Sequence, residues 1–127
     1  LKNRFVKPSV GAVVTFEGLV RNENEGQKVD SLEYEIYESL AVSEGEKIIE
    51  EAMTTFTIHN AYAIHRQGHL KLSEAAVWIM VLAAHRTPAF MACQYNIDQI
   101  KIRLPIWKKE NYCDKTVQWV NFQGSHH

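Results

Sequence analysis

The segment Ala75–Ala84 (AAVWIMVLAA) constrains the fold more than any other part of the chain. It is a continuous apolar run with the length of a single strand, and it contains several residues that favour β-structure. A strand with one solvent-exposed face would alternate apolar with polar residues, and this run does not. We therefore predict a central strand that is buried on both faces.

Other segments predict strands around this one. Gly11–Val20 is rich in β-branched residues, and Ser31–Glu38 alternates apolar with acidic side chains, as a strand with one solvent-exposed face does. The polar segment Arg21–Asp30 between them predicts a loop. Ala61–Leu72 is expected to form a strand or a hairpin that is broken at Gly68.

The first predicted helix covers about Ser39–Phe56, where apolar residues recur at every third and fourth position. Ser43 and Glu46 match a capping box, although the helix can also begin one turn earlier. In the second helix, Thr87 is the expected N-cap and Pro88 the first helical residue. This second helix should end near Arg103.

The inner side of the second helix should carry Phe90 together with Ala89, Cys93, Ile97 and Ile100. Two closing strands, at Pro105–Tyr112 and Lys115–Phe122, complete an order of roughly β-β-α-β-β-α-β-β. This order is typical of an α+β protein with a largely antiparallel sheet.

At 127 residues, the chain has the length of one domain, and we expect a single domain over residues 1–127. It begins with Leu1 instead of Met, so we expect some N-terminal sequence to be missing. A formal net charge of −1 argues against a protein that holds nucleic acid mainly by electrostatics. The chain has no run of about 18 apolar residues. Cys93 and Cys113 form no disulfide framework, so we expect reduced thiols and a cytoplasmic protein.

The segment Ile100–Glu110 (IKIRLPIWKKE) mixes cations with apolar residues around a proline. Pro105 must end the preceding helix, so Lys101 from the helix end and Lys108 from the next strand can reach a common spot that attracts an anion. Two interpretations of Lys101 remain open. It either covers the edge of the core with its methylenes, or it is a partly desolvated nucleophile, base or anion clamp. The alternative for Lys108 is a solvated lysine on a strand edge.

Further cations lie near the ends of predicted strands. His85 and Arg86 follow the central strand at the start of a helix, where anions bind readily. Their alternative interpretation is a loop histidine with satisfied hydrogen bonds beside a surface arginine. Arg21 occupies the comparable place after the first strand.

A metal site is not expected. His65 and His69 would lie about 13 Å apart on a strand, which is too far to share one ion. Cys93 is a weak candidate nucleophile because its helix face is apolar. The chain contains no Walker A loop, GxGxxG fingerprint or GxSxG elbow, and we expect no cofactor.

Taken together, these segments resemble the MoaE family, the large, catalytic subunits of molybdopterin synthase. The two most specific matches follow the family patterns HR-x-x-A-[FY] and K-x-x-x-P-[IF]-W-K. The matching segments run in order over nearly the whole chain and are GAVVTFEGLVRNEN, LEYEIYE, IHRQGHL, AHRTPAF and IKIRLPIWKKE.

The resemblance implies an α/β-hammerhead-type fold with an additional antiparallel β subdomain. It also implies a homodimer within a heterotetramer that contains a small ubiquitin-like sulfur-carrier subunit. The C-terminal Gly-Gly thiocarboxylate of that subunit would deliver sulfur to cyclic pyranopterin monophosphate, a pterin phosphate, and so form the dithiolene of molybdopterin.

The resemblance further implies residue roles. Lys101 and Lys108 would be the catalytic lysines, and His85 and Arg86 would serve the lysines of the neighbouring chain. Glu110 would orient one lysine. The family often has an arginine near the last strand, where this chain has Lys115. The implied substrate-binding residues are Leu19, Val20, Arg21, His85, Arg86, Lys101, Lys108, Lys109 and Glu110.

Two other functions compete with this one. A non-catalytic module that binds an anion or a Gly-Gly tail would keep Arg21, His85 and Arg86 but would not need both lysines. RNA binding through Ile100–Lys109 is disfavoured by the net charge and by the lack of paired exposed aromatic residues. Because a thiocarboxylate and a phosphate ester are both anions, several cations are needed to bring them together.

Overall fold

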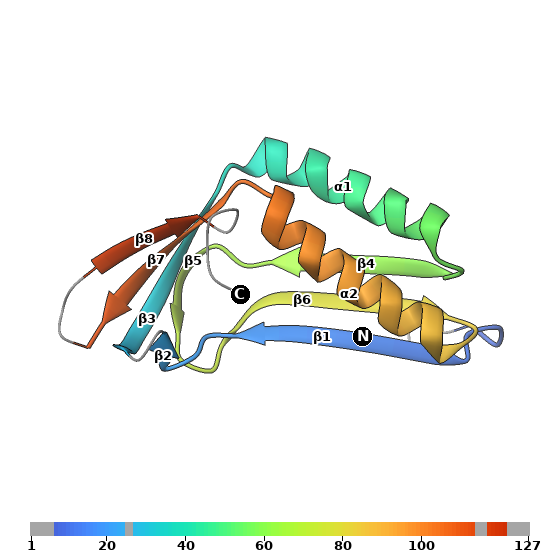
Figure 1. Cartoon of the computed structure of the whole chain (residues 1–127), viewed down its shortest axis with the longest axis horizontal. Helices are drawn as coiled ribbons and strands as arrows, with labels where there is room; N and C mark the ends of the chain where they lie inside the picture. The colour runs from blue at the N-terminus through green and yellow to red at the C-terminus, as the bar shows by residue number, and fades with distance from the viewer. Residues whose placement is uncertain (1–6, 25–26, 114–116, 122–127) are drawn as a thin grey trace.

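The computed structural model describes residues 7–24, 27–113 and 117–121 (Figure 1). Among these residues, neither helix combines the length and the apolar character that a membrane crossing requires. The elements are β1 (Ala12–Leu19), β2 (Glu23–Asn24), β3 (Gln27–Ile36), α1 (Glu38–Thr55), β4 (Asn60–His65), β5 (Gly68–Lys71), β6 (Ala75–Ala83), α2 (Arg86–Arg103), β7 (Ile106–Tyr112) and β8 (Val117–Asn121).

The first sheet is antiparallel, with the strand order β1-β6-β4. Its central strand, β6, is the apolar run that was predicted to be buried on both faces. Met80 and Val81 point to opposite faces of the sheet, and both are 0% exposed, which confirms the prediction. Helix α2 packs against β6 and β1, while α1 packs against α2 and β4.

The second sheet is also antiparallel, with the order β2-β3-β7-β8 and with β5 paired to β3. Figure 1 shows this sheet at one end of the molecule, beside the end of α2 and the start of α1. Two antiparallel sheets and two helices confirm the predicted α+β class. The second sheet therefore lies beside the segment that carries Lys101 and Lys108, where α2 ends and β7 begins.

One loop prediction was wrong, and one strand prediction needs a correction. Within Arg21–Asp30, Glu23 pairs with Lys28 in a short β2–β3 ladder, and Val29 is buried in β3. Polar residues concealed this ladder because the solvated edge of a sheet tolerates them. Ala61–Leu72 is neither one strand nor a hairpin, because β4 and β5 belong to different sheets. Gly68, at φ +90°, starts β5 after the chain has changed sheets.

The predicted start of the first helix, at about Ser39, is confirmed to within one residue, but the capping box of Ser43 and Glu46 is not. Helix α1 begins at Glu38, because the Ala41 N–H already donates to the Tyr37 carbonyl, and Ser43 lies inside the helix. Tyr37 is the N-cap residue, but its side chain makes no capping hydrogen bond, and its own N–H donates to the Pro105 carbonyl.

The N-cap of the second helix lies two residues before the predicted Thr87. His85 is the N-cap of α2, so Pro88 lies in the first turn, where a missing N–H costs nothing. Phe90 is 60% exposed, because the buried stripe is centred on other residues and leaves Phe90 outside it. The buried α2 residues are Ala89, Ala92, Cys93, Asn96, Ile97 and Ile100.

Candidate functional site

Lys101 and Lys108 flank the change from helix to strand that Pro105 enforces. Lys101 is half-buried in the last turn of α2, and the Leu104 N–H closes that turn on the Ile100 carbonyl. Lys108 lies on β7 on the same face as the fully buried Ile106, because side chains alternate along a strand. Both lysines therefore approach the inner side of the second sheet.

The electrostatics of Lys108 place three cations close together. Burial lowers the pKa of Lys108, and the positive charges of Lys101 and Arg21 lower it further, while Glu110 opposes the change. These charges act over a short range in a partly buried site, so their effect on one amine requires proximity. The structure thus brings Lys101 close to Lys108, as the spacing of the two lysines predicted, and it adds Arg21, which only the family resemblance had implied.

Glu110 is the carboxylate of this site, and it is only 2% exposed. Its Oε2 lies 3.9 Å from the Lys108 Nζ. Its Oε1 accepts a hydrogen bond of 2.9 Å from the Tyr112 hydroxyl. We call Arg21, Lys101, Lys108, Glu110 and Tyr112 the strand cluster.

Two aromatic residues border the strand cluster. Tyr34 lies directly opposite Lys108 on β3, and burial, together with the charge of Glu110, raises the pKa of Tyr34 to about 12. His65 packs edge-on against Tyr34, with ring centroids 4.9 Å apart. Burial lowers the pKa of His65, although a hydrogen bond of 2.7 Å with the Arg66 carbonyl opposes this.

Tyr34 and Tyr112 were not among the site residues predicted from the sequence. Alternation along Ser31–Glu38 placed Tyr34 on an apolar face, and Tyr112 follows Glu110 at the spacing of one strand face. That spacing was a usable signal for Tyr112. It gained meaning only once Glu110 was known to be buried.

His85 and Arg86 do not join the strand cluster within one chain. They lie at the opposite end of α2 from Lys101. With a rise of 1.5 Å per residue, Arg86 and Lys101 are about 22 Å apart along the helix axis. The two ends of α2 therefore do not meet at one compact site within a single chain.

The remaining predicted residues lie around the strand cluster. Leu19 is exposed at the end of β1, and Val20 is buried, with its N–H bound to the Glu74 carbonyl. Lys109 points to the opposite face from Lys108, and its Nζ lies 5.8 Å from the centroid of the Trp119 ring. Lys115 lies outside the described residues.

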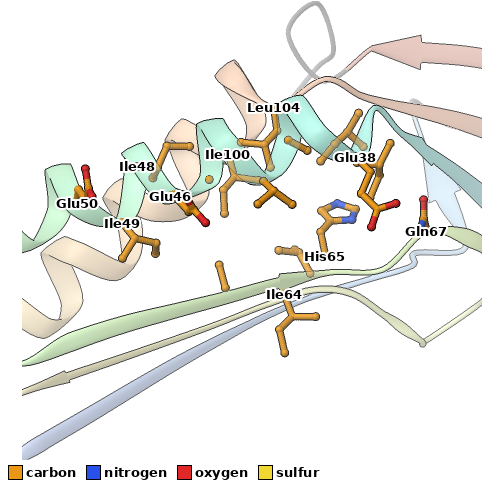
Figure 2. A pocket seen from close by; sticks show the side chains of 17 residues that line it. Glu38, Glu46, Ile48, Ile49, Glu50, Ile64, His65, Gln67, Ile100 and Leu104 are labelled. Carbon is orange, nitrogen blue, oxygen red and sulfur yellow. The ribbon is translucent and has the colours of Figure 1, made fainter.

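A cavity of about 570 Å³ lies between α1 and β4, and His65 is among the residues that line it (Figure 2). Apolar residues such as Ile48 and Leu104 line it, and Glu46 lies on its α1 side. None of Arg21, Lys101 and Lys108 lines this cavity. Among the residues that the structure describes, no three side chains of the metal-ligating types are grouped to hold an ion. The strand cluster is therefore the candidate site, because it holds the reactive and charged groups.

Comparisons with known proteins identify relatives of the chain. The family model described as MoaE protein matches residues 1–103. The molybdopterin synthase catalytic subunit of Thermoplasma volcanium is 46% identical over 87% of this chain and 80% of its own length. That of Pyrococcus abyssi is 41% identical over 94% of this chain and 78% of its own length.

Solved structures share the fold. Molybdopterin synthase from Staphylococcus aureus superposes with a TM-score of 0.87 and 36% identity, over 93% of this chain and 85% of its own. A complex of subunits 1 and 2 of the molybdopterin-converting factor from Helicobacter pylori gives a TM-score of 0.73. Its 22% identity, over 94% of this chain and 76% of the other, supports the shared fold alone.

Proposed function

This chain belongs to the MoaE family, the catalytic subunits of molybdopterin synthase, and from that premise we propose that Lys101 and Lys108 are its catalytic residues. The chain is accordingly a sulfur-transferring enzyme of molybdenum cofactor biosynthesis. The proposed sulfur donor is the C-terminal Gly-Gly thiocarboxylate of a small ubiquitin-like partner subunit. The proposed acceptor is cyclic pyranopterin monophosphate.

The convergence of Arg21, Lys101 and Lys108 is the observation that carries this proposal. A thiocarboxylate and a phosphate ester repel each other, and the repulsion is strongest where water is excluded. Fixed cations in a half-buried site offset that repulsion without having to reorganise during the reaction. An arginine suits the phosphate because its planar fork can bind two oxygens at once.

The two lysines take different roles in this proposal. Lys101 binds the carbonyl of the donor tail while the sulfur forms its bond to a substrate carbon, the carbon–oxygen bond at that carbon breaks, and the departing oxygen takes up a proton. Water then breaks the bond between the sulfur and the tail carbonyl carbon, which leaves a carboxylate on the tail. Lys108, whose pKa is lowered mainly by burial, is suited to exchange a proton with the pterin.

A second copy of the chain completes the proposed site. His85 and Arg86 lie at the far end of α2, so those of a neighbouring chain would meet the lysines of this one if the two helices ran in opposite directions. Phe90, Met91 and Ile102 on α2 are each more than half exposed, which supports an apolar contact at this helix. The complete assembly would be a homodimer with one small subunit on each chain.

Reconstitution with a thiocarboxylated small subunit and the pyranopterin substrate tests the catalytic assignment. We expect Lys101→Ala to lower dithiolene formation by about a hundredfold or more, because it removes a group that contacts the reacting atoms. The matched control is Lys47→Ala, which removes an exposed lysine that pairs with Glu44. Full product formation by Lys101→Ala would sink the assignment and would favour the non-catalytic tail-binding module.

Mixed dimers test the sharing of the site. One chain carries Lys101→Ala and Lys108→Ala, and the other carries His85→Ala and Arg86→Ala. If each site combines lysines from one chain with His85 and Arg86 from the other, each mixed dimer regains one of its two sites and about half of the activity of a wild-type dimer. If each site lies within one chain, mixed dimers stay inactive.

A further inference from the structure

Three side chains on one face of β7 form a chain of contacts that ends at the proposed catalytic amine. Lys108, Glu110 and Tyr112 occupy every second position of β7, so their side chains lie on the same, inner face of the strand. We propose that Tyr112 is a positioning residue, whose hydroxyl holds the Glu110 carboxylate beside Lys108 without letting it close onto the ammonium. This inference rests on the proposed role of Lys108 and adds a residue that acts through Glu110.

The distances support this role. The Tyr112 hydroxyl donates to the Glu110 Oε1 at 2.9 Å, a normal hydrogen-bond length. The other oxygen, Oε2, lies 3.9 Å from the Lys108 Nζ. A direct bond between an ammonium and a carboxylate is about 2.7–2.9 Å long. One carboxylate oxygen is therefore held by the tyrosine, and the other faces the lysine at a longer distance.

Because Glu110 and Tyr112 are both buried, the hydrogen bond between them strongly affects where the carboxylate lies. Glu110 is 2% exposed and Tyr112 is 7% exposed, so bulk water does not compete for the carboxylate. A buried carboxylate depends on hydrogen-bonding partners, and hydrogen bonds to charged groups are stronger than those between neutral groups. The loss of a single hydroxyl should therefore change where this carboxylate lies.

The charged groups around Lys108 show in which direction the pKa of its amine would change if one of them moved or were removed. Lys101 from α2 and Arg21 after β1 act against its positive charge, whereas Glu110 on its own strand supports it. Tyr34, opposite on β3, also senses Glu110, because that carboxylate contributes to its raised pKa. The position of Glu110 therefore determines how far its charge offsets the effects of burial and of the two cations on the pKa of Lys108.

Two substitutions should move the pKa of Lys108 in opposite directions. Glu110→Gln removes the supporting charge and should lower the pKa of Lys108 below its wild-type value. Tyr112→Phe removes one hydrogen bond from the carboxylate, which should then lie closer to the lysine, and the tighter pair should raise the pKa of Lys108. Both changes conserve side-chain size, so the fold should be retained.

The measurement is an NMR titration of the full chain labelled with carbon-13 at the lysine ε position. Lys108→Arg assigns the Lys108 signal by removing it. Because this titration needs neither partner nor substrate, it reports on the positioning role even if the chain proves to transfer no sulfur. In the reconstituted assay, Tyr112→Phe should lower kcat about tenfold at neutral pH while KM for the small subunit stays unchanged.

Tyr95→Phe is the matched control. The Tyr95 hydroxyl donates to a different carboxylate, Glu51, at 2.5 Å, and this pair lies between α1 and α2. Its loss should leave the Lys108 titration and kcat unchanged. An unmoved Lys108 titration in Tyr112→Phe, or a shift in the same direction as in Glu110→Gln, would overturn the positioning role.

Discussion

Two regions of the chain are built from the same three groups: a cation, a carboxylate and a tyrosine hydroxyl. In the strand cluster, the amine of Lys108 stays 3.9 Å from its carboxylate. In the other region, which we call the helix cluster, the arginine contacts its two carboxylates at 2.6 Å and 3.3 Å. The helix cluster joins α1 to α2 and consists of Arg103, Glu44, Glu51 and Tyr95.

The two clusters differ in their balance of positive and negative charge, and this difference distinguishes a structural cluster from a candidate functional one. In the helix cluster, one arginine serves two carboxylates, and Lys47 adds a further contact to Glu44. In the strand cluster, two further cations and one carboxylate act on Lys108, so three cations stand against one carboxylate. Direct, balanced contacts hold two helices together, whereas an excess of half-buried positive charge attracts an anionic ligand. The excess charge, and not the number of ion pairs, marks the candidate site.

Removing the carboxylate from each cluster should give the largest contrast. Glu110→Ala leaves neighbouring cations around a buried gap, and we expect it to lower the free energy of unfolding by about 3 kcal/mol or more. Glu51→Ala affects a carboxylate at the protein surface, so its urea midpoint should stay close to that of the wild type. Urea denaturation of the two variants side by side is the measurement. Equal destabilisation would show that burial does not distinguish the clusters.

Anion binding should give the next largest contrast. Pyrophosphate serves as the probe, and calorimetry measures its dissociation constant. Lys101→Ala and Lys108→Ala should each weaken binding about tenfold, which corresponds to about 1.4 kcal/mol. Arg103→Ala should leave the dissociation constant unchanged, because Glu44 and Glu51 already occupy that guanidinium. An equal loss in Arg103→Ala would mean that the probe binds the surface without preference for the strand cluster.

Local sequence signals account for the backbone of the candidate site. Pro105 had to end a helix, and alternation placed Lys108 beside Ile106, so the approach of the two lysines was predictable. The length of the second helix also implied that Arg86 and Lys101 lie far apart in one chain. Rules of this kind work because they depend on neighbours within a few residues.

Contacts between distant segments were not predictable in the same way. The β2–β3 ladder was missed because its residues are polar, and the start of α1 is fixed by the Pro105 carbonyl and not by Ser43. The sequence predicted only that the second helix ends near Arg103, although this residue also joins the two helices through its ion pair with Glu51. Such contacts depend on how the layers pack, which a single sequence pattern does not encode.

The acid response of the helix cluster should be the smallest effect. Hydrogen bonds from Lys47 and Arg103 lower the pKa of Glu44, and hydrogen bonds from Arg103 and Tyr95 lower that of Glu51. A carboxylate whose pKa is lower in the folded state stabilises the fold above the unfolded value of 4.5, and this contribution is lost as the pH falls through the folded value. The wild type should therefore exceed Arg103→Ala slightly in urea midpoint at neutral pH, and this difference should shrink in acid. A difference that stays constant down to pH values well below 4.5 would show that Arg103 stabilises the helices by packing its methylenes and not by its charge.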